Sequence, residues 1–154
     1  MYNGFVRVAA AIPQLRVADC AFNATQILEL ARRAESENVQ VVCFPELSLT
    51  GYTCGDLFLQ QQLLQNAEKA LSRLLFDSFT LTSVLIIGMP VRAGNKLFNA
   101  AVVIQGGHIL GVVPKSVIPN NGEFYEKRWF AASERNSDTI VLDERVVPFG
   151  TNLL

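Results

Sequence analysis

The sequence predicts an α/β fold in which a mixed β-sheet carries helices on one face. Three observations support this fold class. Apolar runs rich in β-branched residues alternate with two stretches of helical periodicity, and a Gly-Gly pair then joins two further strands. Two of the runs are apolar on both sides, so a second layer is needed to cover the face that the helices leave open. At 154 residues, the chain has the length of one domain.

The first strand and the first helix are predicted from the amino-terminal residues. Residues 5–12, "FVRVAAAI", form an apolar run that Pro13 closes, which is the pattern of a central strand. From Asn23 onward, apolar side chains recur at helical spacing, with charged residues on the opposite side. Asn23 is a suitable N-cap, and Gln26 stands at the capping-box position. We therefore expect a helix that packs on one side only.

A second strand, helix and strand continue the alternation. Residues 39–44, "VQVVCF", predict a strand that is buried on both faces and that Pro45 ends. Leucines recur at helical spacing over residues 56–75, and residues 83–91, "SVLIIGMPV", predict another buried strand. This order places Glu46 at the carboxyl end of a strand.

The rest of the chain predicts two hairpins. The stretches "KLFNAAVVIQ" and "HILGVVPK" flank Gly106 and Gly107, which accept the positive φ angles of a tight turn. The tail "DTIVLDERVVPFGTNLL" predicts two short strands around a polar turn at Asp143 and Glu144. Antiparallel hairpins beside parallel strands make the sheet a mixed one.

The composition gives no sign of a nucleic-acid or membrane partner. Hydrophobic residues make up 50% of the chain, charged residues make up 18%, and the formal net charge is -1. Such a chain has no basic footprint for nucleic acid or an anionic membrane. The amino terminus lacks the pattern of a signal peptide, and no apolar run approaches the roughly 18 residues of a membrane span. We therefore expect a cytoplasmic protein.

The cysteines and the single histidine suggest neither a metal site nor a disulfide. Cys20, Cys43 and Cys54 are odd in number and have no C-x-x-C spacing. Cys43 lies within a predicted strand and is expected to be buried and inert, whereas a helix dipole could acidify Cys20. His108 is expected to be a turn residue at the start of a strand. We therefore assign no metal site and no cofactor to residues 1–154.

Two charged residues stand just past the ends of predicted strands. Glu46 follows one apolar run and Lys115 follows another, at the edge where an α/β sheet presents catalytic groups. A carboxylate at such a place can equally be a cap or a turn residue, and a lysine can simply mark a strand end that faces water. Neither residue by itself decides between these interpretations.

The two stretches that hold these residues resemble a known family. "FPELSLTGY" at 44–52 and "VPKSVIPNNGEFYEKRWF" at 113–130 resemble the glutamate and lysine motifs of the nitrilase, or carbon-nitrogen hydrolase, superfamily. More closely, "PELSLTGYTCGDLF" and "AAVVIQGGHILGVVPKSVIPNNGEFYEKRWF" resemble the amino-terminal glutaminase domain of bacterial glutamine-dependent NAD synthetases. The resemblance covers essentially the whole chain.

This resemblance implies a nitrilase-like αββα sandwich, of which the chain would carry the first half, and a Glu-Lys-Cys triad. Glu46 would be the general base that takes the proton of a cysteine thiol. Lys115 would stabilise the oxyanion of the tetrahedral intermediate, and Glu123 would orient the lysine and keep it charged. Tyr52 would line the pocket near glutamine.

Two departures from the family pattern stand out. Asn121 replaces the tyrosine of the pattern "PNYGEFYEKRWF". An aromatic wall of the glutamine pocket is therefore missing or supplied elsewhere. Asn121 is assigned to substrate binding only by its position in the pattern. The nucleophile is absent, because no cysteine follows Lys115. Cys54, eight residues after Glu46, falls in the "TCGDLF" segment and is expected to pack as a spectator. We therefore expect residues 1–154 to be part of a glutaminase domain, without its second half and without the synthetase domain.

The resemblance also implies partners. L-glutamine would be the substrate, and ammonia would pass to a synthetase domain of the same chain that uses ATP and magnesium. Uncovered apolar sheet surface would favour a homo-oligomer. Two alternatives stay open: an amidase or carbamoylase, which would lack the "TCGDLF" and "EFYEKRWF" extensions, and a non-catalytic hydrolase-like interaction module.

Overall fold

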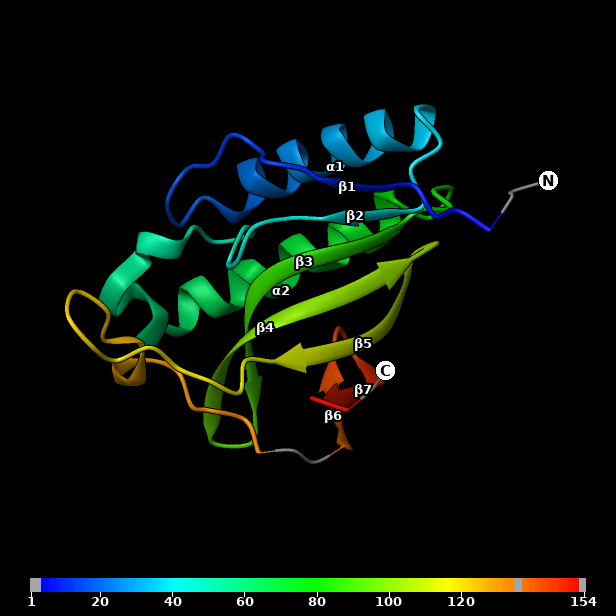
Figure 1. The fold of residues 1–154 in the computed structure, drawn as a ribbon. Helices are drawn as coiled ribbons and strands as arrows, with labels where there is room; N and C mark the ends of the chain where they lie inside the picture. Colours follow the sequence, from blue (N-terminus) through cyan, green and yellow to red (C-terminus); the bar gives the residue numbers. More distant parts are fainter. Residues whose placement is uncertain (1–3, 135–136, 153–154) are drawn as a thin grey trace.

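A computed structural model describes residues 4–134 and 137–152 of the chain. Over these residues the strands join into one sheet of seven, in the order β1-β2-β3-β4-β5-β7-β6 (Figure 1). The elements are β1 (Val8–Ala10), α1 (Cys20–Ser36), β2 (Val41–Cys43), the 3-10 segment η1 (Tyr52–Leu59), α2 (Gln61–Asp77), β3 (Val84–Ala93), β4 (Lys96–Gln105), β5 (His108–Pro114), the 3-10 turn η2 (Glu126–Arg128), β6 (Ser137–Leu142) and β7 (Arg145–Gly150). Every predicted strand is present, but β1 is an edge strand of the sheet and not the central strand that its apolar run indicated.

The sheet is mixed, as predicted. Strands β1, β2 and β3 run parallel, β3, β4 and β5 form antiparallel pairs, and β7 lies parallel to β5 and antiparallel to β6. Both predicted turns have the expected backbone. Gly106 and Gly107 have φ angles of 54° and 77°, and Asp143 and Glu144 have φ angles of 53° and 59°. The β4–β5 and β6–β7 hairpins are therefore confirmed.

Both α-helices lie on one face of the sheet. Helix α1 packs against α2, and α2 packs against β3; Figure 1 shows α2 running behind β3 and β4. The side chains of β3 and β4 on this face alternate along each strand and are buried: Leu85, Ile87, Met89, Ala100, Val102 and Ile104. Together, these alternating buried side chains form the core on the helix side of the sheet.

The opposite face of the sheet has no covering layer among the described residues. Val8 is 67% exposed, Cys43 is exposed, and Ile86 and Ala101 are only half-buried. The expectation that β2 is buried on both faces is therefore wrong within this chain, because both helices cover the side of Val42. The predicted need for a second layer is visible as an uncovered apolar surface.

The start of the first helix differs from the prediction. Helix α1 begins at Cys20, and the carboxylate of Asp19 accepts the amide N–H of Phe22 at 3.1 Å. Asn23 is not the cap but a fully buried residue inside the helix. Its amide donates to the carbonyls of Arg16 at 2.9 Å and Leu49 at 3.1 Å, so it joins the helix start to the loop after β2. The local spacing that indicated Asn23 as the cap contains no information about tertiary partners, which here bind its side chain instead.

The predicted helix over residues 56–75 is divided. Residues up to Leu59 belong to η1, Gln60 is extended with φ -86° and ψ 126°, and α2 then runs from Gln61 to Asp77. Gly55 breaks the helical geometry inside η1, since it has a φ of 57° and a ψ of -134°. No helix in the described part of the chain is long and apolar enough to cross a membrane.

Candidate active site

Glu46 lies in a tight turn that follows β2. The turn is closed by hydrogen bonds from the Ser48 amide to the carbonyl of Pro45 at 3.1 Å and from the Gly51 amide to that of Leu47 at 2.7 Å. It rests directly on β3, because a Cβ at Gly88 would collide with the backbone of Pro45, Glu46 and Leu47. The Gly88 carbonyl also accepts the Leu49 amide at 3.0 Å. A glycine on the neighbouring strand thus fixes where the Glu46 carboxylate emerges.

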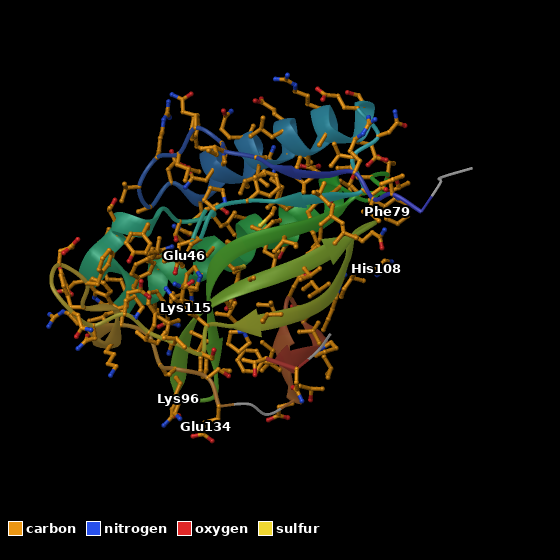
Figure 2. The ribbon with its side chains drawn as sticks, viewed as in Figure 1. Glu46, Phe79, Lys96, His108, Lys115 and Glu134 are labelled. Carbon is orange, nitrogen blue, oxygen red and sulfur yellow. The ribbon has the colours of Figure 1, made fainter. Side chains whose placement is uncertain are left out.

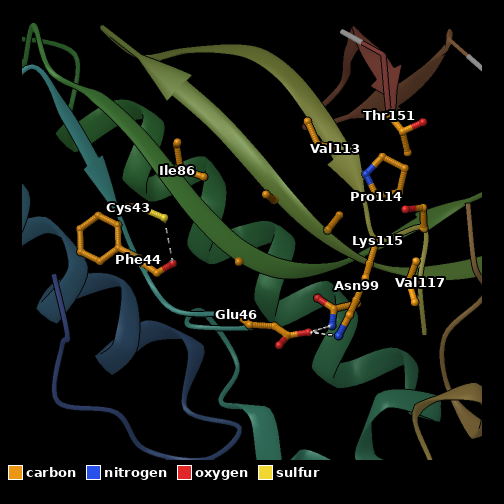
Figure 3. A pocket seen from close by; sticks show the side chains of 14 residues that line it. Cys43, Phe44, Glu46, Ile86, Asn99, Val113, Pro114, Lys115, Val117 and Thr151 are labelled. Atoms are coloured by element: carbon orange, nitrogen blue, oxygen red, sulfur yellow. Dashed lines mark hydrogen bonds and ion pairs between the residues drawn. The ribbon is translucent and has the colours of Figure 1, made fainter. Parts of the chain in front are cut away.

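Lys115 meets this carboxylate from the other side. It follows Pro114 at the end of β5, and its amide donates to the carbonyl of Asn99 on β4 at 2.8 Å. Its Nζ lies 2.6 Å from Oε1 of Glu46 (Figure 3). The expectation that these two residues converge is confirmed, although 69 positions separate them in the sequence.

A second carboxylate holds the lysine, and it is Glu126 rather than Glu123. Lys115 Nζ lies 3.2 Å and 3.1 Å from the Oε1 and Oε2 atoms of Glu126, whose side chain is 3% exposed. Glu123 is exposed, because the loop turns at Gly122 with a φ of 61° and directs the following residues to water. The assignment of Glu123 to orient Lys115 is therefore corrected to Glu126.

The spacing to buried aromatic residues could have identified Glu126 from the sequence. Phe130 is buried and its amide donates to the carbonyl of Glu126 at 2.8 Å, as in one turn of a helix. Residues four apart on such a turn share a face, so Glu126 points inward with Phe130. Glu123 precedes the turn and lacks this relation.

Tyr52 and Asn99 complete the site. The Tyr52 hydroxyl donates to Oε1 of Glu126 at 2.7 Å, so Tyr52 joins the cluster through that carboxylate. Asn99 is 3% exposed, and its amide Nδ2 donates to Oε1 of Glu46. Asn99 was not predicted as a site residue; a polar side chain inside the apolar run of β4 was the available signal. Asn121 is exposed, which leaves its predicted contact with substrate without support from this geometry.

The electrostatics of the cluster favour a charged lysine. Burial alone would lower the pKa of Lys115, but hydrogen bonds and charges from Glu46 and Glu126 outweigh it and raise the pKa above its ordinary value. Burial, the hydrogen bond to Glu126 and the nearby carboxylates raise the pKa of Tyr52, which therefore stays a neutral donor. Among the described residues, Oε1 of Glu46 accepts both hydrogen bonds and Oε2 accepts none. Oε2 is thus open to a new proton.

A cavity of about 590 Å³ opens beside the cluster. Its polar end is formed by Glu46, Asn99 and Lys115, and its walls include the apolar side chains of Ile86 and Val113 (Figure 3). The cavity lies on the uncovered face of the sheet and is also lined by Cys43 and Val117. Cys43 was expected to be buried and inert, but its side chain is exposed at the carboxyl end of β2, because no layer covers this face.

The other two thiols lie away from the cavity. Cys54 is buried, with Sγ 3.2 Å from the carbonyl of Thr50, and burial raises its pKa. Burial also raises the pKa of Cys20 to about 11, which overrides the acidifying effect expected at a helix start. Across residues 4–134 and 137–152, His, Cys, Asp and Glu form no group of three that could hold a metal ion.

Comparison with known proteins places the chain in a family. Residues 7–153 match the family model described as carbon-nitrogen hydrolase. The chain belongs to this family of hydrolases. Glu46 and Lys115, which contact each other, lie in the two sequence stretches that resemble motifs of that family.

Within the family, the similarity is to glutamine-dependent NAD(+) synthetases. The enzyme of Mycobacterium tuberculosis is 43% identical over 152 residues, which cover 99% of this chain but 22% of that protein. The crystal structure of the enzyme from Cytophaga hutchinsonii superposes with a TM-score of 0.87 at 29% identity, over 94% of this chain and 25% of that one. The resemblance inferred from the two motifs is confirmed. The chain spans about a fifth of the length of the curated relatives it matches.

An amidase from Nesterenkonia shares the fold. Its structure superposes with a TM-score of 0.74 at 22% identity, over 93% of this chain and 54% of that one. The E-to-Q variant of that amidase shows covalent addition of the acetamide moiety of fluoroacetamide at its active site cysteine. The predicted nitrilase-like fold is confirmed by these neighbours.

Proposed function

We propose that residues 1–154 form the first part of a glutaminase domain, and that Glu46 and Lys115 act in hydrolysis of the glutamine side-chain amide. The observation that carries the proposal is the 2.6 Å contact between Lys115 Nζ and Glu46 Oε1 at the mouth of a cavity. Similarity to glutamine-dependent NAD(+) synthetases over nearly the whole chain supports the substrate. The nucleophile would be a cysteine from a part of the enzyme beyond these residues.

The chemistry uses the open oxygen of Glu46. Oε2 of Glu46 takes the proton of the incoming thiol, and the thiolate attacks the side-chain carbonyl carbon of glutamine. The carbonyl oxygen gains the negative charge, and the intermediate collapses as Glu46 returns the proton to the leaving nitrogen, so that ammonia departs and a thioester remains. Glu46 then removes a proton from water as the oxygen attacks the thioester carbon, and it returns that proton to the sulfur as the C–S bond breaks, which releases glutamate and the thiol.

Lys115 supplies positive charge for the oxyanion. Its ammonium has three N–H donors and contacts one oxygen of Glu46 and both oxygens of Glu126. One of these donors would bond the oxyanion, while Glu126 keeps the lysine charged.

The ammonia would serve a synthetase domain of the same, longer chain. In this proposal, ATP and magnesium act in that domain, and residues 1–154 hold no cofactor of their own. Cytoplasmic location and assembly into a homo-oligomer belong to the same proposal. Support comes from the names of the relatives and from the uncovered sheet face, which an additional layer would cover.

Substitutions in the longer chain test this function. Glu46→Ala and Lys115→Ala should each lower glutamine-driven NAD synthesis by orders of magnitude, because each removes a group needed for the thiolate or the oxyanion. Ammonia-driven synthesis should persist in both. Asp77→Ala, which changes a partly buried carboxylate on α2, is the control and should leave both activities intact. Loss of both activities in Glu46→Ala or Lys115→Ala would contradict the proposal.

A further inference from the structure

The "TCGDLF" and "EFYEKRWF" segments meet at the carboxylate of Asp56. Oδ1 of Asp56 accepts hydrogen bonds from Nε of Arg128 at 2.6 Å and from Nε1 of Trp129 at 2.9 Å. Oδ2 accepts a further bond from Nη2 of Arg128 at 2.8 Å. A paired guanidinium contact with an additional indole donor leaves this carboxylate little freedom to reorient.

The same two segments carry the outer members of the candidate active site. Tyr52 is the first residue of η1, which contains Asp56, and Glu126 is the first residue of η2, which contains Arg128. The Tyr52–Glu126 hydrogen bond therefore forms an inner link between the segments, and Asp56–Arg128 forms an outer one. Figure 1 shows these two segments side by side at one end of the molecule, around residues 55 (teal) and 127 (gold).

Turn η2 needs support from outside itself. It contains three residues, which is too short for a helix to be stable alone. The loop before it is joined by few backbone contacts, among them the Glu126 amide to the carbonyl of Pro119 at 3.3 Å. Packing of the Phe58 ring against Trp129 and Phe130, with ring centroids 5.9 Å and 4.9 Å apart, adds an apolar contact but no direction. Asp56 supplies directional contacts at the outer end of η2, in addition to the hydrogen bonds that Tyr52 and Lys115 donate to Glu126.

The alternative is an ion pair without consequence. Asp56 and Arg128 have side chains that are 61% and 55% exposed, and exposed ion pairs contribute little to global stability. An ion pair that adds little to the stability of the fold can still fix the position of a side chain. Here the side chain is that of Glu126, which is buried and must lie within hydrogen-bond reach of Lys115. A small shift of η2 would break that contact without unfolding the chain.

We propose that Asp56 is a positioning residue: by holding Arg128 and Trp129, it fixes η2 so that the Glu126 carboxylate stays on the Lys115 ammonium. The relevance of this to catalysis rests on the proposed glutaminase function, whereas the positioning itself does not. The "TCGDLF" segment thus supplies the carboxylate, and the "EFYEKRWF" segment supplies the groups that donate hydrogen bonds to it.

The test measures how fast Lys115 of the 154-residue chain is acetylated by acetic anhydride, with Lys96, the exposed first residue of β4, as the internal reference (Figure 2). Only the neutral amine reacts, so the rate rises about tenfold for each unit by which the pKa of Lys115 falls. Glu126→Gln should raise the rate about three- to tenfold. Asp56→Ala and Arg128→Ala should do the same, and the double variant Asp56→Ala/Glu126→Gln should react no faster than Glu126→Gln alone.

A matched control and a conservative variant complete the test. Asp77→Ala removes another carboxylate that is paired with an arginine, 3.3 Å from Arg73 Nε, and should leave the Lys115 rate unchanged. If circular dichroism shows that Asp56→Ala has unfolded, Asp56→Asn, which keeps the shape, decides the question. An unchanged Lys115 rate in the folded Asp56 variant, or an effect that adds to that of Glu126→Gln, would overturn the proposal. An unchanged rate in Glu126→Gln would overturn it too.

The outcome is independent of whether the proposed function holds. In the longer chain, Asp56→Ala should also lower kcat for glutamine-driven synthesis and leave ammonia-driven synthesis intact. Failure of the glutaminase function would appear as glutamine turnover that does not depend on Lys115, with the acetylation result unaffected. Failure of the positioning role would appear as unchanged acetylation in a chain whose glutamine turnover does depend on Lys115.

Discussion

At the scale of single residues, the site depends on how one ammonium is shared. Lys115 lies between a half-exposed carboxylate, Glu46, and a buried one, Glu126. The two contacts differ in purpose. Glu46 has an oxygen free to accept a proton, whereas both oxygens of Glu126 are already bonded, one of them to Tyr52. Glu126 is therefore suited to fixing the charge, and Glu46 to moving a proton.

Replacement of Glu126 by glutamine should weaken catalysis and shift its pH dependence. Carboxylate partners raise the pKa of Lys115 above 10.5, so the lysine of the wild-type chain stays protonated until pH rises through that elevated value. Glu126→Gln removes one partner and lowers the pKa. The alkaline decline of glutamine-driven kcat should then begin at a lower pH, and kcat at neutral pH should fall about ten- to hundredfold.

The control for this prediction is Glu123→Gln, since Glu123 is exposed and separate from the cluster. Its pH profile should match that of the wild-type chain. Equal shifts in the two variants would show that loop charge in general, rather than the Lys115 contact, sets the alkaline limb.

At the scale of elements, the carboxylate of Glu35 ties α1 to the segment that leads into β3. It accepts hydrogen bonds from the amides of Thr82 at 3.1 Å and Ser83 at 2.9 Å, and from both hydroxyls at 2.6 Å and 2.5 Å. The slight burial of Glu35 would raise its pKa, but these four donors outweigh it and lower the pKa from 4.5 to about 2. This link holds the end of α1 against the start of β3.

Replacement of Glu35 by alanine should lower stability in a pH-dependent way. The folded pKa is depressed, so the contribution of Glu35 is fully present above pH 4.5 and is lost as pH falls toward 2. Urea unfolding at neutral pH should show a loss of about 1 kcal/mol, since solvent screens a largely exposed group. The difference from wild type should vanish near pH 2. Glu29→Ala is the control on the exposed side of α1, and a loss that stays constant with pH would contradict this account.

Local patterns predicted the elements better than their ends. Alternation and turn glycines were sufficient for the strands and for both hairpins, because these signals depend on neighbours in sequence. The cap of α1 was wrongly assigned to Asn23, which instead bonds a carbonyl of a distant loop, and the break at Gln60, where the backbone is extended, was missed. Glu46 and Lys115 could be placed because both follow strand ends, where topology brings side chains to one edge.

For Asn99 and Glu126, the sequence carried a signal that the side chain turns inward, but it did not show that either one reaches Glu46 or Lys115. Asn99 lies in the middle of a strand and Glu126 follows a loop with few regular contacts, so their approach to Glu46 and Lys115 depends on tertiary packing. The exposure of Cys43 was not predicted either, because it also depends on tertiary packing. Periodicity shows that a strand has two apolar faces, but it does not show which face another layer covers.

At the scale of the whole molecule, helices cover one face of the sheet and leave the other open. The open face holds the cavity, and its apolar side chains extend to Val8 on the edge strand β1. An exposed apolar sheet face is typical of an interface. The candidate active site thus lies on the surface that most needs a partner layer.

The 154-residue chain should therefore self-associate through this face and should not hydrolyse glutamine by itself. Val8→Glu should reduce the associated fraction seen by light scattering, because it places a charge on the open face. Phe76→Glu is the control, since Phe76 is 83% exposed near the end of α2, on the helix side. A monomeric wild-type chain at high concentration, or glutamine turnover abolished by Cys43→Ser or Cys54→Ser, would contradict this prediction.

The contact between Gly88 and the turn of Glu46 has a consequence for anyone who wants to transplant the "PELSLTGY" motif into another scaffold. The turn depends on a neighbouring strand for its position, because it rests on the backbone of Gly88, where no side chain stands in the way. A graft that copies the motif but leaves an ordinary side chain on the receiving strand would lift the carboxylate out of reach of its lysine. The smallest transferable unit is accordingly a pair of neighbouring strands, of which the second contributes no functional group at all.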